Sequence, residues 1–255
     1  MKEEKILVKE IETNYKIGGK GENFLILHGW GGSSDSWRKI IELLEIKYKV
    51  ICPDFPGFGK TKTPENPWDL NNFVDWVKEF VDRLNLESFF LLGHSFGGRV
   101  AVRFSALFPK RVKKLILVSP AGIKQKWGIK EKVLFQLAKI GNAIFSKNPL
   151  LRFKEGMRNI FYWLFKIKDY SRAKGVMKET MKKIVEEDIL PELSKIQKET
   201  LIIWGRNDKL VPLKYAFIFK ENIKNSKLEI LPRIGHSPHL EDPEKLVEIL
   251  ISNLK

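Results

Sequence analysis

The sequence predicts an α/β fold, in which a mostly parallel sheet is covered by helices on both faces. Two observations lead to this prediction. Short apolar runs alternate with longer segments whose apolar residues recur at helical spacing. The runs are apolar at nearly every position, as expected of strands that are buried on both faces of a parallel sheet. The 255 residues, 43% of them hydrophobic, are enough for one such domain with a large core.

Each expected element follows from a local pattern. The first two strands are expected to pair as an N-terminal hairpin or as edge strands, and the other strands are short apolar runs that end near Gly, Pro or Asp. The helix over 70–84 has the clearest pattern, because its apolar residues share one face. The expected strands are 6–8, 15–17, 24–27, 50–52, 89–92, 115–118, 201–204 and 228–231, and the expected helices are 36–44, 70–84, 99–108, 213–221 and 243–253.

One stretch interrupts this alternation. Between Pro120 and about Ile196 the pattern is helical, rich in aromatic residues and without a convincing strand. Residues 122–196 carry 17 Lys/Arg against 8 Asp/Glu, which is a net +9 of the chain's formal +15. We predict a core domain formed by 1–120 and 197–255, and a helical cap formed by 121–196. The cap is expected over the C-terminal edge of the sheet, where open α/β sheets bind ligands.

The composition of the chain predicts its cellular location and the classes of partner that it binds. The charged N-terminus has no apolar stretch of signal length, and no run approaches the roughly 20 apolar residues of a spanning helix. With Cys52 as the single cysteine, a reducing cytoplasm is the expected location. We attribute the positive charge to general lysine richness, and we expect no nucleic-acid partner because no zinc-finger or RNA-binding signature is present. Contact of the basic, aromatic insert with a membrane surface is the minor alternative.

A G-x-S-x-G segment is the strongest functional motif. Ser95 lies between the apolar run 89–92 and the helical pattern from Arg99, so it is expected on a sharp strand-to-helix turn. Gly93 and Gly97 permit this turn, because a Cβ at either position would clash with neighbouring backbone. The hydroxyl is then exposed at the sheet edge, close to the N-terminus of the next helix. Ser95 is therefore the candidate nucleophile.

A serine nucleophile needs a base, and that base is sought among four histidines. His236 and His239 both follow the last expected strand. His236 is the expected base, because Gly235 gives it a flexible loop position, whereas His239 is expected to pack or to help begin the last helix. His94 is expected to point away from the tip of the turn. His28 ends an early strand.

The orienting carboxylate and the oxyanion donors complete the prediction. Asp208 follows the strand 201–204 and gives the chain order Ser, Asp, His. Asp54 competes for the role, but it precedes the serine in a loop of Pro and Gly, which favours a structural role. The backbone N–H groups of Phe96 and Trp30 are the expected oxyanion donors, with Gly31 as the alternative to Trp30.

Together these residues resemble the α/β-hydrolase superfamily, from Phe24 to the C-terminus. The matching segments are 28–31 (HGWG), 53–59 (PDFPGFG), 93–98 (GHSFGG), 204–212 (WGRNDKLVP) and 235–243 (GHSPHLEDP). They look like the branch that contains esterases, carbon–carbon bond hydrolases, cofactor-free haloperoxidases and epoxide hydrolases. The resemblance implies a core of eight strands with a cap after the sixth. Ser95 stands where epoxide hydrolases and dehalogenases have Asp, which argues against both activities.

The expected activity is hydrolysis of a carboxylic ester through an acyl-enzyme, with no metal or organic cofactor. The aromatic insert predicts an apolar small-molecule ester as substrate, and the sequence identifies no substrate-binding residue. C–C bond hydrolysis and acyl transfer by the same residues are alternatives. A non-enzymatic protein that binds a ligand on the same fold is a further alternative.

Overall fold

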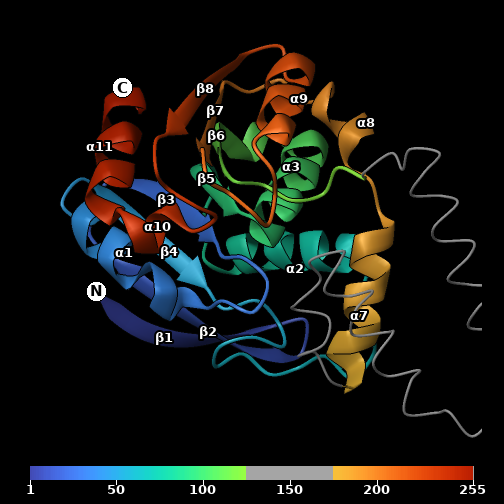
Figure 1. The fold of residues 1–255 in the computed structure, drawn as a ribbon. Coiled ribbons are helices and arrows are strands. Elements are labelled where there is room, and N and C mark those ends of the chain that lie inside the picture. Colours follow the sequence, from blue (N-terminus) through green and yellow to red (C-terminus); the bar gives the residue numbers. More distant parts are fainter. Residues whose placement is uncertain (125–174, 255) are drawn as a thin grey trace, which may run out of the picture. The chain divides into compact units, whose positions relative to one another are not determined.

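Eight strands in the described residues form one sheet, in the order β1-β2-β4-β3-β5-β6-β7-β8 (Figure 1). The computed structural model describes residues 1–124 and 175–254. β2 pairs antiparallel with β1 and β4, and the other neighbouring strands pair in parallel. The predicted α/β fold is confirmed. The strands are β1 (Lys2–Val8), β2 (Ile11–Gly18), β3 (Glu22–Leu27), β4 (Tyr48–Pro53), β5 (Phe89–His94), β6 (Val112–Val118), β7 (Thr200–Gly205) and β8 (Ser226–Leu231).

The helices of the described part follow the sequence pattern closely, with small differences at their ends. The helix expected from Arg99 begins directly after Ser95, and the short α10 was not expected at all. The α-helices are α1 (Arg38–Leu44), α2 (Leu70–Arg83), α3 (Phe96–Leu107), α7 (Gly175–Glu186), α8 (Leu190–Leu193), α9 (Lys214–Asn222), α10 (Pro238–Glu241) and α11 (Pro243–Asn253), and the 3-10 helices are η1 (Ser34–Trp37) and η2 (Pro109–Arg111).

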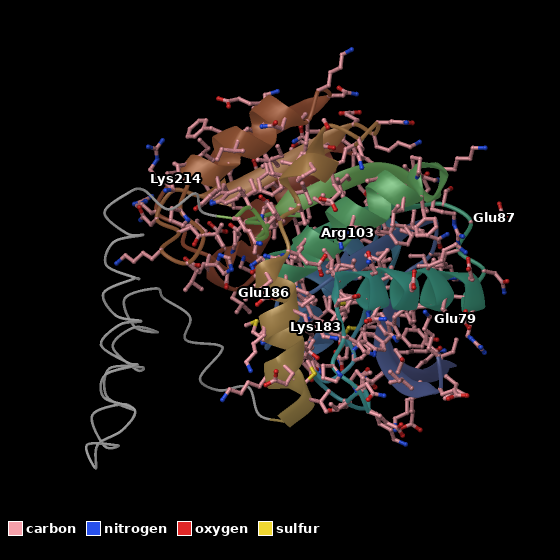
Figure 2. The ribbon with its side chains drawn as sticks, turned by 90° about the vertical axis from the view of Figure 1, so that its right-hand side faces the viewer. Glu79, Glu87, Arg103, Lys183, Glu186 and Lys214 are labelled. Atoms are coloured by element: carbon pink, nitrogen blue, oxygen red, sulfur yellow. The ribbon has the colours of Figure 1, made fainter. Side chains whose placement is uncertain are left out.

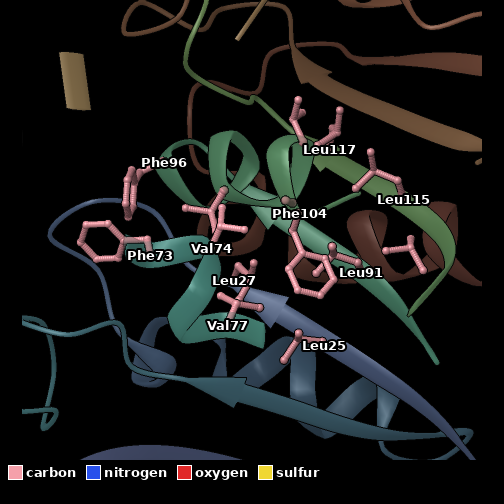
Figure 3. Close-up of a cluster of buried hydrophobic side chains, with 14 of the residues drawn as sticks. Leu25, Leu27, Phe73, Val74, Val77, Leu91, Phe96, Phe104, Leu115 and Leu117 are labelled. Carbon is pink, nitrogen blue, oxygen red and sulfur yellow. The ribbon is translucent and has the colours of Figure 1, made fainter. Parts of the chain in front are cut away.

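Two hydrophobic layers cover the two faces of the sheet. On β3, Leu25 and Leu27 pack toward α2 and α3, whereas Phe24 and Ile26 pack toward α1 and α11. Figure 3 shows the first layer, where Phe73 of α2 and Phe104 of α3 lie over the strands. Full burial of a large apolar side chain contributes about 1.5–3 kcal/mol relative to exposure. The central strands are therefore apolar at successive positions because both of their faces are covered.

Residues 1–123 and 175–254 form one compact unit, and α7 belongs to it. Arg103 of α3 forms an ion pair with Glu187 just after α7 and another with Glu192 of α8, the latter at 2.7 Å. Figure 2 shows Arg103 beside the end of α7, where Glu186 is labelled. Residues 125–174, which hold most of the predicted cap, lie outside the described residues. The division into a core and a cap over 121–196 stays a prediction.

The topology brings the sequence-predicted site residues to one edge of the sheet. Trp30 follows β3, Ser95 follows β5, Asp208 follows β7 and His236 follows β8. These strands are parallel to one another, so their carboxyl ends share one edge. Ligands bind at this edge in open α/β sheets.

Candidate active site

Ser95 sits in a strained turn between β5 and α3. Its φ is +52° and its ψ is −113°, a conformation that side-chain-bearing residues rarely adopt. Two glycines permit the turn: a Cβ on Gly97 would lie 2.1 Å from the Leu27 carbonyl oxygen, and a Cβ on Gly93 would lie 2.4 Å from the Gly97 carbonyl oxygen. The Ser95 N–H donates to the Val118 carbonyl at 3.1 Å, which ties the turn to β6. The turn thus holds the hydroxyl at the sheet edge.

The three side chains predicted to act together are joined through His236, which lies within hydrogen-bonding distance of both Ser95 and Asp208. His236 Nε2 is 2.9 Å from Ser95 Oγ, and His236 Nδ1 is 2.7 Å from Asp208 Oδ2. Ser95 occupies the N-cap position of α3, but its side chain caps no N–H of the helix. The hydroxyl is therefore available to the imidazole.

The Asp208 carboxylate is fixed by its own loop. One oxygen, Oδ1, accepts hydrogen bonds from the Leu210 and Val211 N–H groups, each at 2.8 Å. The other oxygen faces His236, and the carboxylate is fully buried. Because a carboxylate only accepts, His236 Nδ1 carries the proton of that hydrogen bond. His236 Nε2 is then the acceptor for the Ser95 hydroxyl, which is the tautomer that a general base requires.

The loop after β3 lies against the serine turn. A Cβ on Gly29 would be 3.3 Å from the Ser95 Cβ, and the Trp30 and Phe96 rings stand edge to face with centroids 5.3 Å apart. The loop is held by His28, whose Nδ1 contacts the Gly29 carbonyl at 2.8 Å. Among the described residues, neither the Trp30 N–H nor the Phe96 N–H donates to another protein group. Within the part of the chain that the structure describes, the two N–H groups expected to bind the oxyanion are therefore without an acceptor, and their segments contact each other at the serine turn.

The remaining histidines and Asp54 lie outside this chain of hydrogen bonds. His239 stacks on Trp37 with centroids 4.2 Å apart, and burial lowers the pKa of His239 to about 3. His28 Nε2 accepts from the Phe55 N–H at 2.9 Å. Asp54 is buried and accepts from the Ser34 N–H at 2.6 Å and the Lys60 N–H at 2.9 Å, so its oxygens brace the loops around it.

His94 has a contact that sequence reasoning missed. Its side chain forms no hydrogen bond with Ser95, but its Nε2 lies 2.8 Å from the His236 carbonyl oxygen. Burial lowers the pKa of His94 well below the ordinary histidine value. No sequence signal indicates this contact, because its target is a main-chain oxygen 142 residues away.

Aromatic rings surround the serine turn. Trp30 stands edge to face against Phe58 and Phe96, with centroid distances of 4.8 and 5.3 Å, and Phe55 contacts Phe96 at 5.3 Å.

Within the described part of the chain, no cluster of three or more His, Cys, Asp or Glu side chains could hold a metal ion. None of the described helices is long and apolar enough to cross a membrane.

Comparisons with known proteins agree with this architecture. Residues 22–243 match the model of the alpha/beta hydrolase fold family. The chain is 30% identical over 263 residues to a 2-hydroxy-6-oxo-6-(2'-aminophenyl)hexa-2,4-dienoic acid hydrolase of Metapseudomonas resinovorans, with 96% of this chain and 88% of that protein covered. It is 27% identical over 259 residues to the human monoacylglycerol lipase ABHD6, with 92% of this chain and 76% of that protein covered.

A solved structure gives the same result in three dimensions. The structure of a serine hydrolase involved in carbazole degradation, the CarC enzyme, matches with a TM-score of 0.76 and 27% identity, covering 99% of this chain and 98% of that one. Of the two relatives, one is named as the hydrolase of a hexadienoic acid and the other as a monoacylglycerol lipase. The chain belongs to the α/β-hydrolase fold family.

Proposed function

We propose that this protein hydrolyses a carboxylic ester through an acyl-enzyme, with Ser95 as nucleophile, His236 as general base and Asp208 as the orienting carboxylate. The observation that carries the proposal is the unbroken line of hydrogen bonds from Asp208 Oδ2 through the imidazole to Ser95 Oγ, at 2.7 and 2.9 Å. A serine hydroxyl is a weak nucleophile on its own, and this arrangement supplies the base that activates it.

The reaction proceeds in two halves. Ser95 Oγ attacks the ester carbonyl while His236 Nε2 takes the hydroxyl proton, and Asp208 stabilises the imidazolium. The Phe96 and Trp30 N–H groups stabilise the oxyanion, and each such donor contributes about 100- to 1000-fold in rate. His236 then protonates the leaving alcohol. A water molecule, deprotonated by His236, attacks the acyl-enzyme and releases the carboxylic acid and the free serine.

We propose an apolar ester as the substrate class. The rings of Trp30, Phe58 and Phe96 contact one another beside the serine turn, so an acyl or alcohol group there meets apolar surface. The likeness to a monoacylglycerol lipase supports an ester with an apolar chain. We keep the membrane surface as a second partner to test with anionic vesicles at low and high salt.

Hydrolysis of a C–C bond is the second candidate, and a specific observation favours it. The 30% identical relative is named for hydrolysis of a 2-hydroxy-6-oxo-dienoic acid. The same three side chains can serve both reactions, because each needs an activated oxygen nucleophile at a carbonyl. Chromatography of the products separates the reactions, since an ester yields an alcohol and an acid, whereas a vinylogous diketone yields two carbon fragments. Turnover of the diketone alone would favour the second candidate.

The central test compares Ser95→Ala with a matched control, Ser105→Ala. Ser105 lies on the same helix, is buried, and has an Oγ without a hydrogen-bond partner among the described residues, so its loss leaves the fold and the site intact. Ser95→Ala should remove about a million-fold of turnover, if the three side chains act as a unit. Ser105→Ala should stay within about threefold of the wild type in the same assays.

The assay is hydrolysis of a panel of p-nitrophenyl esters of increasing acyl length, followed by labelling with a fluorophosphonate. Acylation of Ser95 by the probe, mapped by peptide mass spectrometry, distinguishes an enzyme from a protein that only binds a ligand. Equal hydrolysis by Ser95→Ala and the wild type would defeat the proposal. The rates across acyl lengths report the size of the apolar site.

A further inference from the structure

Three consecutive residues at the tip of the loop after β8 are each held by a side chain. Glu241 accepts hydrogen bonds from the Gly235 N–H at 2.7 Å and from the Ser237 N–H at 3.0 Å, one at each carboxylate oxygen. Between them, the His236 carbonyl oxygen lies 2.8 Å from His94 Nε2. The backbone on both sides of His236 and at His236 itself is therefore tied down.

The His94 ring can serve only as a donor in this contact. A carbonyl oxygen accepts and never donates, so His94 Nε2 carries the proton. The residue is only 5% exposed, which disfavours a second proton on the ring. Its ring is confined, because a Cβ on Gly29 would lie 2.9 Å from His94 Nδ1 and the His239 ring stands 4.7 Å away. His94 thus presents a fixed N–H to the loop.

Glu241 holds the loop from α10, on the C-terminal side of His236. α10 begins at Pro238, and the Leu240 and Glu241 N–H groups both donate to the Ser237 carbonyl, at 2.9 and 3.0 Å. The carboxylate of Glu241 folds back over the two N–H groups that flank His236. An ionised carboxylate makes stronger hydrogen bonds to N–H groups than a neutral acceptor does.

We infer that His94 and Glu241 are positioning residues, which clamp the main chain of His236 so that its imidazole stays within reach of both Ser95 and Asp208. The inference rests on the proposed function of His236 as the base. His94 precedes Ser95 directly in the chain, so consecutive residues supply the nucleophile and hold the residue that activates it. A reacting group displaced by about 1 Å can lose about 100-fold in rate, which is the effect that the clamp prevents.

The test uses four variants of the full chain. His94→Leu removes the donor, and His94→Gln keeps an N–H near the position of Nε2. Glu241→Ala removes both acceptors at an exposed position. The control is Glu244→Gln, which removes a carboxylate from the same region; Glu244 pairs with Lys39 at 3.4 Å and is itself exposed.

The readouts are the first-order inactivation constant kinact and the affinity constant KI for a fluorophosphonate, each corrected for the folded fraction, together with Tm. We expect kinact to fall about 10- to 100-fold in His94→Leu and Glu241→Ala, with KI within about threefold of the wild type. His94→Gln should recover kinact to within about fivefold of the wild type, because its amide can donate to the same carbonyl. Glu244→Gln should match the wild type.

The outcomes separate the clamp from the proposed function. Wild-type kinact in both His94→Leu and Glu241→Ala would overturn the clamp while leaving Ser95 as the nucleophile. An equal loss in His94→Gln and His94→Leu would overturn the role of the His94 donor. A wild-type protein that the probe does not label would remove the proposed function, and the clamp with it.

Discussion

Acidification to pH 5 should weaken the fold through two buried histidines, His94 and His239. Burial lowers the pKa of His239 to about 3 and that of His94 well below its usual value. The unfolded chain binds a proton at each of them near pH 6.5, whereas the folded chain does not. Their contribution to stability is therefore present above about pH 6.5 and is lost as the pH falls below that value, toward the folded-state pKa.

The magnitude follows from the linkage between proton binding and folding. A histidine with a pKa near 6.5 in the unfolded chain and about 3 in the folded chain lowers the free energy of unfolding by about 2 kcal/mol when the pH falls from 7 to 5. His239→Gln removes one such group and keeps a side chain of similar volume beside Trp37. The variant should lose about 2 kcal/mol less than the wild type over the same pH range.

Urea unfolding followed by circular dichroism at pH 7 and pH 5, at constant ionic strength, measures the two losses. Leu240→Ala is the matched control, since Leu240 lies on the same short helix, is 61% exposed and carries no titrating group. It should show the wild-type loss. An identical loss in His239→Gln and the wild type would refute the reasoning, because His239 would then bind its proton equally in both states.

Three further substitutions test the remaining structural claims. Asp208→Asn should lower kcat for an ester about 10⁴-fold with KM unchanged in steady-state assays, because an amide does not hold His236 in the required tautomer; a loss below tenfold would remove Asp208 from the mechanism. Gly97→Ala should cost on the order of 3 kcal/mol in urea unfolding, because its Cβ would meet the Leu27 carbonyl at 2.1 Å; wild-type stability would show that the turn can relax. Asp54→Ala should cost about 3 kcal/mol by leaving the buried N–H groups of Ser34 and of the Asn14 side chain without an acceptor, yet change ester hydrolysis per folded molecule by less than about threefold; inactivity of the folded variant would assign Asp54 to the chemistry.

The fold was predictable because its central strands, β3 to β7, are buried on both faces. β5 is buried at all six positions, and its first four residues, 89–92, form an uninterrupted apolar run that is followed by a helical pattern from Arg99. The 3-10 turn at Ser34–Trp37 and the helix Pro238–Glu241 are only four residues long, which is too short for a period to develop. Their boundaries depend on packing, as in the stack of His239 on Trp37, rather than on local sequence.

The positions of Ser95 and Asp208 were predictable for a different reason. The turn at Ser95 requires small neighbours on both sides, and this requirement leaves a local mark in the sequence at Gly93 and Gly97. Asp208 was preferred over Asp54 because it follows the serine in the chain, whereas Asp54 precedes it in a loop of Pro and Gly, and the structure joins Asp208 to His236 at 2.7 Å. Chain order along a parallel sheet therefore carries information about proximity, even between residues far apart in the sequence.

Contacts between a side chain and a distant main chain leave no such mark. Every residue has a carbonyl oxygen, so the His94 side chain could have bonded to the main chain of any residue. Neither the residue type of His236 nor its position in the sequence indicates that His94 is its partner. The Trp30 and Phe96 N–H groups are also backbone groups, but they could be proposed because each follows directly on a strand end or on the nucleophile itself. A main-chain partner can thus be predicted from the sequence when its position in the chain puts it next to the site. When only the tertiary fold brings it there, the three-dimensional structure is needed to find it. His94 contacts a main-chain partner that only the tertiary fold brings close. Its proposed role therefore rests on the 2.8 Å contact between its Nε2 and the His236 carbonyl oxygen, and not on the motif that contains it.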